Sequence, residues 1–466
     1  MTLKKTFQSK YEKLLGQEAT AFFQSLTGDA QQAYRANPSK PQSAMLREEL
    51  EHAAAIPGVP QAYYGSISGH CPAHQAGYLY SQEPSAMLPV LALDPKPDDC
   101  VLDLCAAPGS KATQIASVLG TGEGLLVANE PVPKRAKILA ENLERWGSAN
   151  SIVTEAKPDA LAPHFPAYFD KILVDAPCSG EGMLRKHPHA MAEWTAQTPR
   201  HCADRQKTIL QAALQMLKPG GQLVYSTCTF APEENEEIIS WLLENFPLTL
   251  EAVDLPGTRP AQTAWGLGPD LTKARRVWPM DGFGEGHFIA KLTLNEALAT
   301  LQPSRKKGKK KKRPRSHQGL DPKQQKDWQS FLAAWPLAFE LARYQLRAFG
   351  QHLWALDPRL PALDALRLHK NGLHLGAFRK NRFEPSFALS LAVKNTDTLP
   401  QIELTPSDWQ AYVAGETFPH PGHQGFILLN FKGLIVGLGK QVQGTVKNYY
   451  PKGLRFKTET PKHLVF

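Results

Sequence analysis

The sequence predicts an α/β protein whose central domain is a mostly parallel, doubly wound sheet. From about Asp99 onward, short apolar runs such as CVLDLC, GLLVANE, KILVDAP and QLVYSTCT alternate with stretches of helical pattern. Repeated alternation of this kind is typical of a parallel sheet with helices on both faces. Ligands of such sheets bind beyond the carboxyl ends of the strands, so each loop after one of these runs is a candidate site.

Smaller domains are predicted on either side of this sheet, because a chain of 466 residues is too long for one core. The first part mixes helical signals with Pro- and Gly-punctuated stretches, and the last part contains strand-like runs such as FILLNFKGLIVGLGKQV. We expect an N-terminal domain over 1–92, the central domain over 93–298, a basic linker over 299–318, an α+β domain over 319–395 and a β-rich module over 396–466.

The net charge of +9 is concentrated in one segment of the expected linker. The run RKKGKKKKRPR, Arg305 to Arg315, holds nine of the 53 basic residues, and the other 44 match the 44 acidic residues. A run of like charges repels itself and is often a solvated linker. It is equally suited to be a flexible phosphate-binding tether, because each Lys or Arg that contacts a nucleic acid releases counterions.

Composition also narrows the cellular setting. The cysteines form no CxxC pair and are too sparse for a secreted disulfide scaffold, which favours a reduced cytoplasmic protein. Neither an export signal nor a run of about eighteen apolar residues is visible, so we expect no membrane span. Cys71 and His74, in CPAH, resemble half of a zinc site, but no second pair with suitable spacing follows, and we expect no metal.

The segment DLCAAPGSK, Asp103 to Lys111, lies between the first strand of the predicted sheet and its first helix. A Pro-Gly turn here lets the backbone approach a ligand, and the free amides of the helix can bind it. Glu130 ends the next strand, where an acidic side chain can hold ribose hydroxyls. Because the sequence has neither GxGxxG nor GxxxxGK[ST], we expect a nucleoside without a pyrophosphate, and S-adenosylmethionine fits that description. Asp159, in the following loop, is either a further polar contact or a turn former.

Two cysteines follow strands of the same predicted sheet. Cys178 comes after KILVDAP and Cys228 after QLVYST. Most free cysteines are small buried hydrophobic residues, but two in polar loops at strand ends are also placed to share a reaction site. A thiolate beside a methyl donor suits carbon 5 of cytosine, because addition to carbon 6 makes carbon 5 nucleophilic enough to take a methyl group.

Several motifs together resemble one known family. CAAPGSK, DAPCSGEG, KPGGQLVYSTCTF, PEENEEII and GYLYSQEPSAMLPVLAL are similar to motifs of the Sun and nucleolar-protein family of RNA cytosine 5-methyltransferases. The bacterial subgroup that methylates 16S ribosomal RNA matches best, and QVQGTVKNYYPKGLR resembles its carboxyl-terminal RNA-binding module. The resemblance covers nearly the whole chain. It implies a Rossmann-like methyltransferase domain, a small N-terminal RNA-binding domain over 1–92 and a PUA-like RNA-binding module over 396–466.

The resemblance also implies catalytic roles. Cys228 corresponds to the nucleophile, and Cys178 to the residue that assists breakdown of the covalent adduct. Asp175 would hydrogen-bond the cytosine ring, Pro177 would shape the turn, and Lys111 would lie near the donor and the target base.

For the donor, the resemblance places one loop under the methionine portion, Glu130 at the ribose, Asp159 toward the adenine and Asp175 beside the sulfonium. The loop consists of Cys105, Ala106, Ala107, Pro108, Gly109, Ser110 and Lys111. His287 stands where an aromatic residue is more usual, and we expect only packing consequences from it.

The expected partner is 16S ribosomal RNA or the 30S subunit, bound by a monomer. The alternatives are a transfer RNA methyltransferase with the same chemistry and a ribosome-assembly factor that binds RNA without catalysis. The two cysteines and Asp175 argue against the last alternative, because RNA binding alone requires neither thiol.

Overall fold

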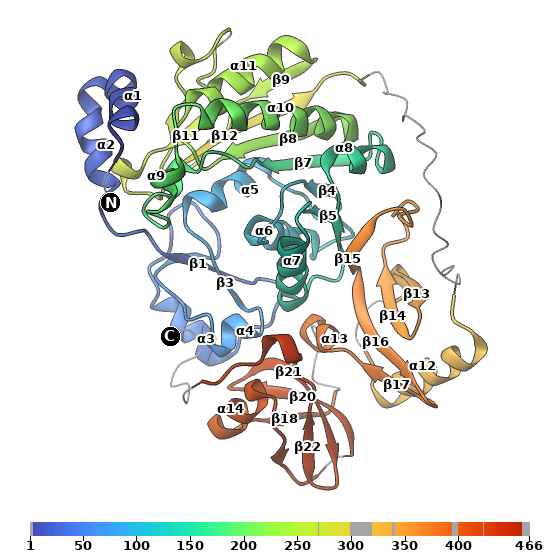
Figure 1. Ribbon diagram of the computed structural model, residues 1–466. Helices are drawn as coiled ribbons and strands as arrows, with labels where there is room; N and C mark the ends of the chain where they lie inside the picture. The colour runs from blue at the N-terminus through green and yellow to red at the C-terminus, as the bar shows by residue number, and fades with distance from the viewer. Residues whose placement is uncertain are drawn as a thin grey trace.

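The computed structural model describes residues 3–268, 270–298, 319–337, 341–393, 399–422 and 424–458. The expected basic linker over 299–318 lies outside these residues. At the centre is a ten-stranded sheet in the order β10-β11-β12-β8-β7-β4-β5-β6-β15, with β9 paired to β12 (Figure 1). Its strands are β4 Cys100–Asp103, β5 Leu125–Asn129, β6 Ser151–Glu155, β7 Phe169–Asp175, β8 Leu217–Thr227, β9 Leu248–Glu251, β10 Arg259–Pro260, β11 Arg275–Val277, β12 His287–Leu294 and β15 Arg367–Asn371.

The predicted fold class is confirmed. The inner strands β8, β7, β4, β5 and β6 pair in parallel, and β12 joins β8 antiparallel. Apolar side chains pack on both faces of the sheet, as an inner parallel sheet requires. One face is covered by α5 Leu88–Leu93, α6 Ser110–Leu119 and α7 Pro133–Trp146, and the other by α8 Pro158–Leu161, α10 Thr198–Met216 and α11 Glu236–Asn245.

The N-terminal part consists of a three-stranded sheet and short helices. The sheet has the order β2-β1-β3, and the first two helices lie beside α9 Ala190–Glu193 (Figure 1). Phe7, Tyr11 and Phe22 of these two helices form one apolar cluster with Trp194 and Phe230 of the central part. The elements are α1 Lys5–Leu15, α2 Ala19–Ser25, β1 Ala33–Ala36, α3 Ala44–Glu51, β2 Ala62–Tyr64, α4 Pro72–Gln75 and β3 Leu79–Ser81.

The C-terminal part holds two further sheets. One has the order β13-β14-β16-β17 and the other the order β18-β20-β21-β22-β19. Their strands are β13 Gln345–Phe349, β14 His352–Leu356, β16 Leu373–Arg379, β17 Arg382–Pro385, β18 Gln401–Glu403, β19 Phe418–Pro419, β20 Gly425–Phe431, β21 Leu434–Val442 and β22 Thr445–Asn448, and their helices are α12 Pro322–Ala334, α13 Phe387–Ala392 and α14 Pro406–Ala414.

One strand connects these C-terminal sheets to the centre. β15 pairs antiparallel with β6, the last of the inner strands. Lys370 of β15 is fully buried and donates hydrogen bonds to three backbone carbonyls, those of Ser148, Ser151 and Gly372, at 2.8–2.9 Å. The central sheet therefore contains one strand from the residues expected to form the α+β domain.

No helix of the described ranges combines the length and the apolar character that crossing a bilayer needs.

Candidate active site

Two thiols lie together at the carboxyl edge of the central sheet. The parallel strands β7 and β8 end at Asp175 and Thr227, and Cys178 and Cys228 follow in the next loops. Their Sγ atoms are 3.4 Å apart, and both side chains are partly exposed. The structure thus brings together the two cysteines that the sequence placed at equivalent strand ends.

An ion pair lies beside the thiols. Lys111, at the start of α6, donates from Nζ to Oδ2 of Asp175 at 2.8 Å, and Ser226 donates to Oδ1 at 2.7 Å. Burial alone would raise the pKa of Asp175, but Lys111, together with the neighbouring His287, lowers it below its usual range. Burial likewise opposes the charge of Lys111, and the carboxylate outweighs it and raises the pKa of the ammonium.

The environment differs between the two thiols. A hydrogen bond with Cys228, followed by burial, raises the pKa of Cys178 well above the ordinary range of a thiol. The positive charge of Lys111 acts on Cys228 as well as on Asp175. Either thiol can donate the hydrogen bond between the two sulfur atoms, which lies close to the positive charge of Lys111.

Two acidic residues hold the cysteine loops in place. Glu181 is 1% exposed and accepts hydrogen bonds from the Trp194 indole at 2.8 Å, the Thr229 hydroxyl at 2.9 Å and the hydroxyl of Tyr11 in α1. Glu234 is fully buried. It accepts from the backbone of Ser179 at 3.0 Å and the side-chain amide of Gln206 at 2.8 Å.

Burial raises the pKa of Glu234 to about 7, against the lowering effect of its hydrogen bond with Ser179. Neither Glu181 nor Glu234 was predicted as a site residue. Both belong to quoted motifs, CSGEG and PEENEEII, but the signal was only an acidic residue shortly after a cysteine.

A cavity of about 910 Å³ opens in front of the thiols. Its size lies in the range of ligand pockets. Apolar side chains of Pro131, Val132 and Ile209 and carboxylates of Glu130 and Asp159 contribute to its wall. The wall also contains Cys105, Ala107, Asp175, Ala176, Pro177, Cys178 and Cys228.

The acidic residue at the end of β5 is well fixed. Glu130 is 2% exposed, accepts a hydrogen bond from the backbone of Val132 at 3.0 Å and pairs with Arg135 of α7 at 3.2 Å. Arg135 also donates to the carbonyl of Ala107 at 2.8 Å. A carboxylate held this way beside apolar walls suits a ribose and a base, so the residues present fit a nucleoside donor such as S-adenosylmethionine.

The other residues predicted to bind the methyl donor lie on or near the same cavity. Cys105 and Ala107 lie on the cavity wall, Ala106 and Gly109 are buried, and Pro108 is exposed. The Ser110 carbonyl accepts a hydrogen bond from Arg35 of β1, and the Pro177 carbonyl accepts one from Gln206. Asp159 is exposed at the cavity rim and caps the amide of Ala160 at 2.9 Å.

The expectation for His287 was wrong. Its Nε2 lies 3.5 Å from Oδ1 of Asp175, and its Nδ1 lies 4.0 Å from Oε1 of Glu83. The side chain therefore contacts the electrostatic centre of the site and does more than fill space. This contact could not be predicted from the sequence, because Glu83, Asp175 and His287 are far apart along the chain.

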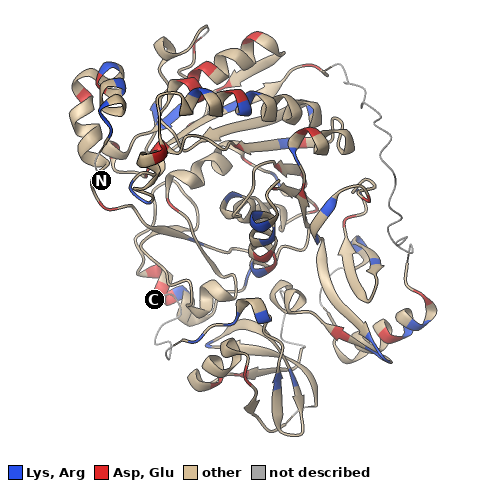
Figure 2. Cartoon of the chain, in the orientation of Figure 1, with Lys and Arg blue, Asp and Glu red and all other residues tan. Residues whose placement is uncertain are grey.

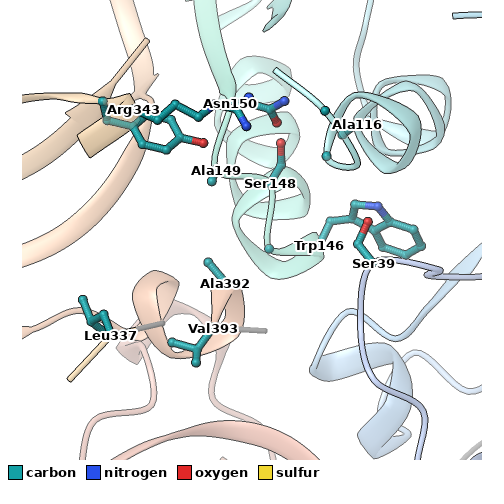
Figure 3. A pocket seen from close by; sticks show the side chains of 14 residues that line it. Ser39, Ala116, Trp146, Ser148, Ala149, Asn150, Leu337, Arg343, Ala392 and Val393 are labelled. Carbon is teal, nitrogen blue, oxygen red and sulfur yellow. The ribbon is translucent and has the colours of Figure 1, made fainter. Parts of the chain in front are cut away.

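A second cavity, of about 280 Å³, lies away from the thiols where α7, α13 and the segment around Arg343 meet (Figure 3). Ser148, Asn150 and Arg343 contribute polar groups to it, but the wall residues include no thiol, imidazole or carboxylate. Within the described ranges, no group of three or more His, Cys, Asp or Glu side chains could hold a metal ion. Of these two cavities, only the larger one has thiols and carboxylates on its wall.

Family models match four successive parts of the chain. The N-terminal domain of 16S rRNA methyltransferase RsmF matches residues 3–84, and 16S rRNA methyltransferase RsmB/F matches residues 90–293. The first C-terminal domain of RsmF rRNA methyltransferase matches residues 330–393, and the methyltransferase RsmF PUA domain matches residues 400–456. These matches confirm the resemblance seen in the sequence motifs and the PUA-like character of the last module.

Curated relatives agree with these family models. Ribosomal RNA small subunit methyltransferase F of Aliivibrio fischeri is 33% identical over 399 residues, which are 82% of this chain and 80% of the relative. The protein of the same name from Escherichia coli is 32% identical over 397 residues, 82% of this chain and 79% of the relative.

A methyltransferase homolog from Pyrococcus horikoshii superposes with a TM-score of 0.56 at 32% identity and covers 62% of this chain and 95% of that one. NSun6 from the same organism, solved with SFG, has a TM-score of 0.56 at 23% identity, covers 63% of this chain and 98% of that one, and supports the fold alone. This chain therefore belongs to the RsmB/F family of 16S rRNA methyltransferases.

Proposed function

We propose that this protein transfers a methyl group from S-adenosylmethionine to carbon 5 of a cytosine in 16S ribosomal RNA, with Cys228 as the covalent nucleophile. The observation that carries the proposal is the pair of thiols 3.4 Å apart beside the ion pair of Asp175 and Lys111. Methylation of a ring nitrogen needs no thiol, whereas carbon 5 of cytosine must first be activated by addition of a nucleophile to carbon 6.

The surroundings of the two thiols support this assignment of roles. The two sulfur atoms share a hydrogen bond that either thiol can donate, and the nearby charge of Lys111 would stabilise a negative sulfur at Cys228. Cys228 Sγ would attack carbon 6 of the cytosine. Asp175, whose side chain is 30% exposed in the cavity, would accept a hydrogen bond from the base and offset charge that develops on the ring.

The same geometry supports a role for Cys178 after the attack. Its Sγ lies 3.4 Å from that of Cys228, so its thiol stays beside the base when the Cys228 sulfur is bonded to carbon 6. Cys178 can then lose its proton to solvent and act as the base that removes the proton from carbon 5. The electron pair of that C–H bond restores the double bond between carbons 5 and 6, and the bond between carbon 6 and sulfur breaks with its electron pair leaving on Cys228 as a thiolate.

When bound, S-adenosylmethionine supplies the methyl group as an electrophile. Glu130 would hold the ribose hydroxyls, and the loop of Cys105 to Lys111 would lie under the methionine portion. Asp159 would contact the adenine from the cavity rim, and Asp175 and Pro177 would border the reacting end. These roles rest on the positions of the side chains around the cavity.

The parts outside the central sheet would bind RNA. We assign this role to the N-terminal domain over 1–92 and to the PUA-like module over 396–466, and the basic linker over 299–318 would add phosphate contacts. The target base must be unstacked to reach Cys228, so an exposed loop of 16S RNA or of the 30S subunit is the proposed substrate, bound by a monomer in the cytoplasm.

Methyl transfer tests the proposal directly. Wild type, Cys228→Ala and Cys178→Ala would be incubated with S-adenosylmethionine and unmodified 30S subunits, naked 16S RNA or bulk transfer RNA, followed by mass spectrometry of the nucleosides. We expect 5-methylcytidine on a ribosomal substrate with wild type and none with Cys228→Ala.

Cys178→Ala should accumulate a covalent protein–RNA complex that survives denaturing electrophoresis. Methylation restricted to transfer RNA would favour the transfer RNA enzyme. RNA binding without any methylation would favour the assembly factor.

A further inference from the structure

One arginine of the N-terminal domain is buried against the first turn of α6. Arg35, on β1, is 3% exposed. Its Nη2 donates to the carbonyl of Ser110 and to the hydroxyl of Thr113, both at 2.8 Å. Its Nε donates to the side-chain oxygen of Gln82, directly after β3, at 2.6 Å. The guanidinium therefore joins two segments of the N-terminal domain to the helix that carries Lys111.

This arginine lies where a positive charge is unfavourable. Burial lowers the pKa of Arg35 to about 9, so the guanidinium still carries its charge near neutral pH. Within the described ranges no carboxylate pairs with it, and it lies at the positive end of the α6 dipole. Besides the neutral acceptors, the rings of Tyr80 and Trp146 offset the charge, with their centres 5.7 and 5.3 Å from Cζ. A buried charge without a counter-ion is weak support for a fold, so packing alone does not account for this arginine.

The contacts of Arg35 with α6 lead to the ion pair of the active site. Ser110 directly precedes Lys111, which is 6% exposed and donates to Oδ2 of Asp175 at 2.8 Å. The Thr113 hydroxyl that accepts from Arg35 also donates to the Ser110 carbonyl at 2.9 Å, so both acceptors belong to one turn. A buried side chain has few alternative directions, and the place of its ammonium therefore follows the backbone of this turn.

The contact with Gln82 leads to the same ammonium by a second route. Gln82 Nε2 donates to the Ala86 carbonyl at 2.8 Å. Glu83, the next residue, accepts from the backbone amide of Ala86 at 2.7 Å, and its negative charge acts on Lys111. Arg35 thus contacts the residue before Lys111 and the residue before an acidic side chain that favours its charge.

We propose that Arg35 is a positioning residue that holds the first turn of α6 and thereby keeps the Lys111 ammonium in place beside Asp175. This inference rests on the proposed function, in which Lys111 lies near the donor and Asp175 contacts the cytosine. Arg35 is not among the residues that line the large cavity, so it acts through the helix. The N-terminal domain then supports catalysis in addition to the RNA binding assigned to it.

Three roles of Arg35 predict different kinetics. A positioning residue for Lys111 changes kcat and leaves the KM for RNA nearly unchanged, because the RNA surface is intact. A residue that contacts RNA changes that KM instead. A purely structural contact lowers the melting temperature, while the kinetics of the folded protein stay those of wild type.

Arg35→Gln should lower kcat about tenfold or more on 30S subunits or 16S RNA, with less than about a twofold change in the KM for RNA. Arg275→Gln is the matched control. Arg275, on β11, also donates to a threonine, to the Thr258 hydroxyl at 2.9 Å and to its carbonyl at 3.1 Å. We expect the control to have the kcat of wild type. A wild-type kcat in folded Arg35→Gln, with or without a raised KM for RNA, would overturn the proposal.

A second variant covers the case in which Arg35→Gln does not fold. Thr113→Val removes one acceptor of Arg35 and has nearly the same shape as the native side chain. It should lower kcat in the same direction as Arg35→Gln but by less. Thermal melting establishes that each variant is folded at the assay temperature. A wild-type kcat in Thr113→Val, where Arg35→Gln is unfolded, would contradict the positioning role.

Donor binding separates this proposal from the proposed function. Isothermal titration with S-adenosylhomocysteine requires neither RNA nor methyl transfer. Because Ser110 and Lys111 belong to the loop proposed to lie under the methionine portion, Arg35→Gln should weaken this binding about threefold or more, and Arg275→Gln should not. If wild type methylates no RNA, the proposed function fails, while weaker binding by Arg35→Gln still supports its hold on the turn. Unchanged binding and unchanged kcat in an active enzyme sink only the positioning role.

Discussion

At the scale of single residues, Glu130 shows how this fold prepares a polar group for a ligand. The end of β5 buries the side chain, while a backbone amide and Arg135 fix its orientation toward the cavity. A buried carboxylate already oriented by the protein loses little entropy when it accepts hydrogen bonds from ribose hydroxyls. The binding energy that a ribose gains at this position should therefore come from the Glu130 carboxylate.

Glu130→Gln is expected to weaken donor binding about tenfold or more, because hydrogen bonds to a charged acceptor are worth about 1.5–3 kcal/mol. Isothermal titration with S-adenosylhomocysteine measures the dissociation constant. Glu141→Gln, on the exposed side of α7 where Glu141 pairs with Lys137 at 3.7 Å, serves as the control and should bind as wild type. Unchanged affinity in Glu130→Gln would show that the ribose is held elsewhere.

The sequence predicts some residues of the site and misses others. Cys178, Cys228 and Glu130 were predicted from their place after apolar runs, because parallel strands deliver their carboxyl ends to one edge. His287 and Glu181 could not be predicted, since their importance comes from contacts with residues more than a hundred positions away. Strand periodicity indicates where a loop begins but not which distant side chains it meets.

At the scale of elements, the two cysteine loops are fastened to each other and to α1. The backbone of Gly182 donates to the Cys228 carbonyl at 2.9 Å, and the hydroxyls of Ser179 and Thr229 are 2.8 Å apart. Glu181 accepts from Thr229 at 2.9 Å and from Tyr11. The first helices thus support the spacing of the thiols although they contribute nothing to the cavity wall.

Tyr11→Phe should lower the free energy of unfolding by about 1–3 kcal/mol, because it leaves the buried Glu181 carboxylate without one of its donors. Urea denaturation followed by fluorescence measures this difference. Tyr168→Phe removes an exposed hydroxyl that donates to the Arg359 carbonyl at 3.1 Å, and it should cost less than about 1 kcal/mol. Equal losses in the two variants would argue against a special role for the contact with Glu181.

Glu234 makes the stability of these loops depend on pH. Burial raises its pKa in the folded protein to about 7 from an ordinary value of 4.5, so the folded state binds more protons than the unfolded state between these values. Stability from this group therefore falls as pH rises from about 4.5 to about 7, by up to about 3 kcal/mol.

Glu234→Gln should remove this dependence and be more stable than wild type above about pH 7. Thermal melting at several pH values compares the two proteins. In Glu237→Gln, at a half-buried neighbour on α11, stability should change with pH as it does in wild type. If the stability of Glu234→Gln still falls with rising pH as in wild type, another group causes the pH dependence.

The element least predictable from the sequence is β15. Its pattern, RLHKN, is short and polar, and its partner β6 lies more than two hundred residues earlier. What holds it is the buried Lys370 amine and the contact of His369 with Glu155 at 2.6 Å, neither of which leaves a periodic signal. The central strands, in contrast, were predictable because burial on both faces demands continuous apolar runs.

At the scale of the whole molecule, the described surface does not carry the excess of positive charge. Figure 2 shows both signs of charge along α7 and α10, and the basic and acidic residues outside Arg305 to Arg315 are equal in number. Electrostatic attraction to RNA by the remaining surface must therefore come from local patches. The nine basic residues of the tract are the largest single source of long-range attraction.

Replacement of those nine residues by Ser, at constant length, should make RNA binding less sensitive to salt. Each phosphate contact contributes about 0.7 to the slope of log K against log salt for a single strand, so nine contacts would contribute up to about six. Fluorescence anisotropy with a 16S RNA fragment across a salt series measures the slope. A variant with every Lys of the tract changed to Arg keeps the charge and should keep the slope. If the Ser variant has the slope of wild type, the tract makes no phosphate contacts and acts only as a solvated linker, and the RNA affinity must then reside in the N-terminal domain and the PUA-like module.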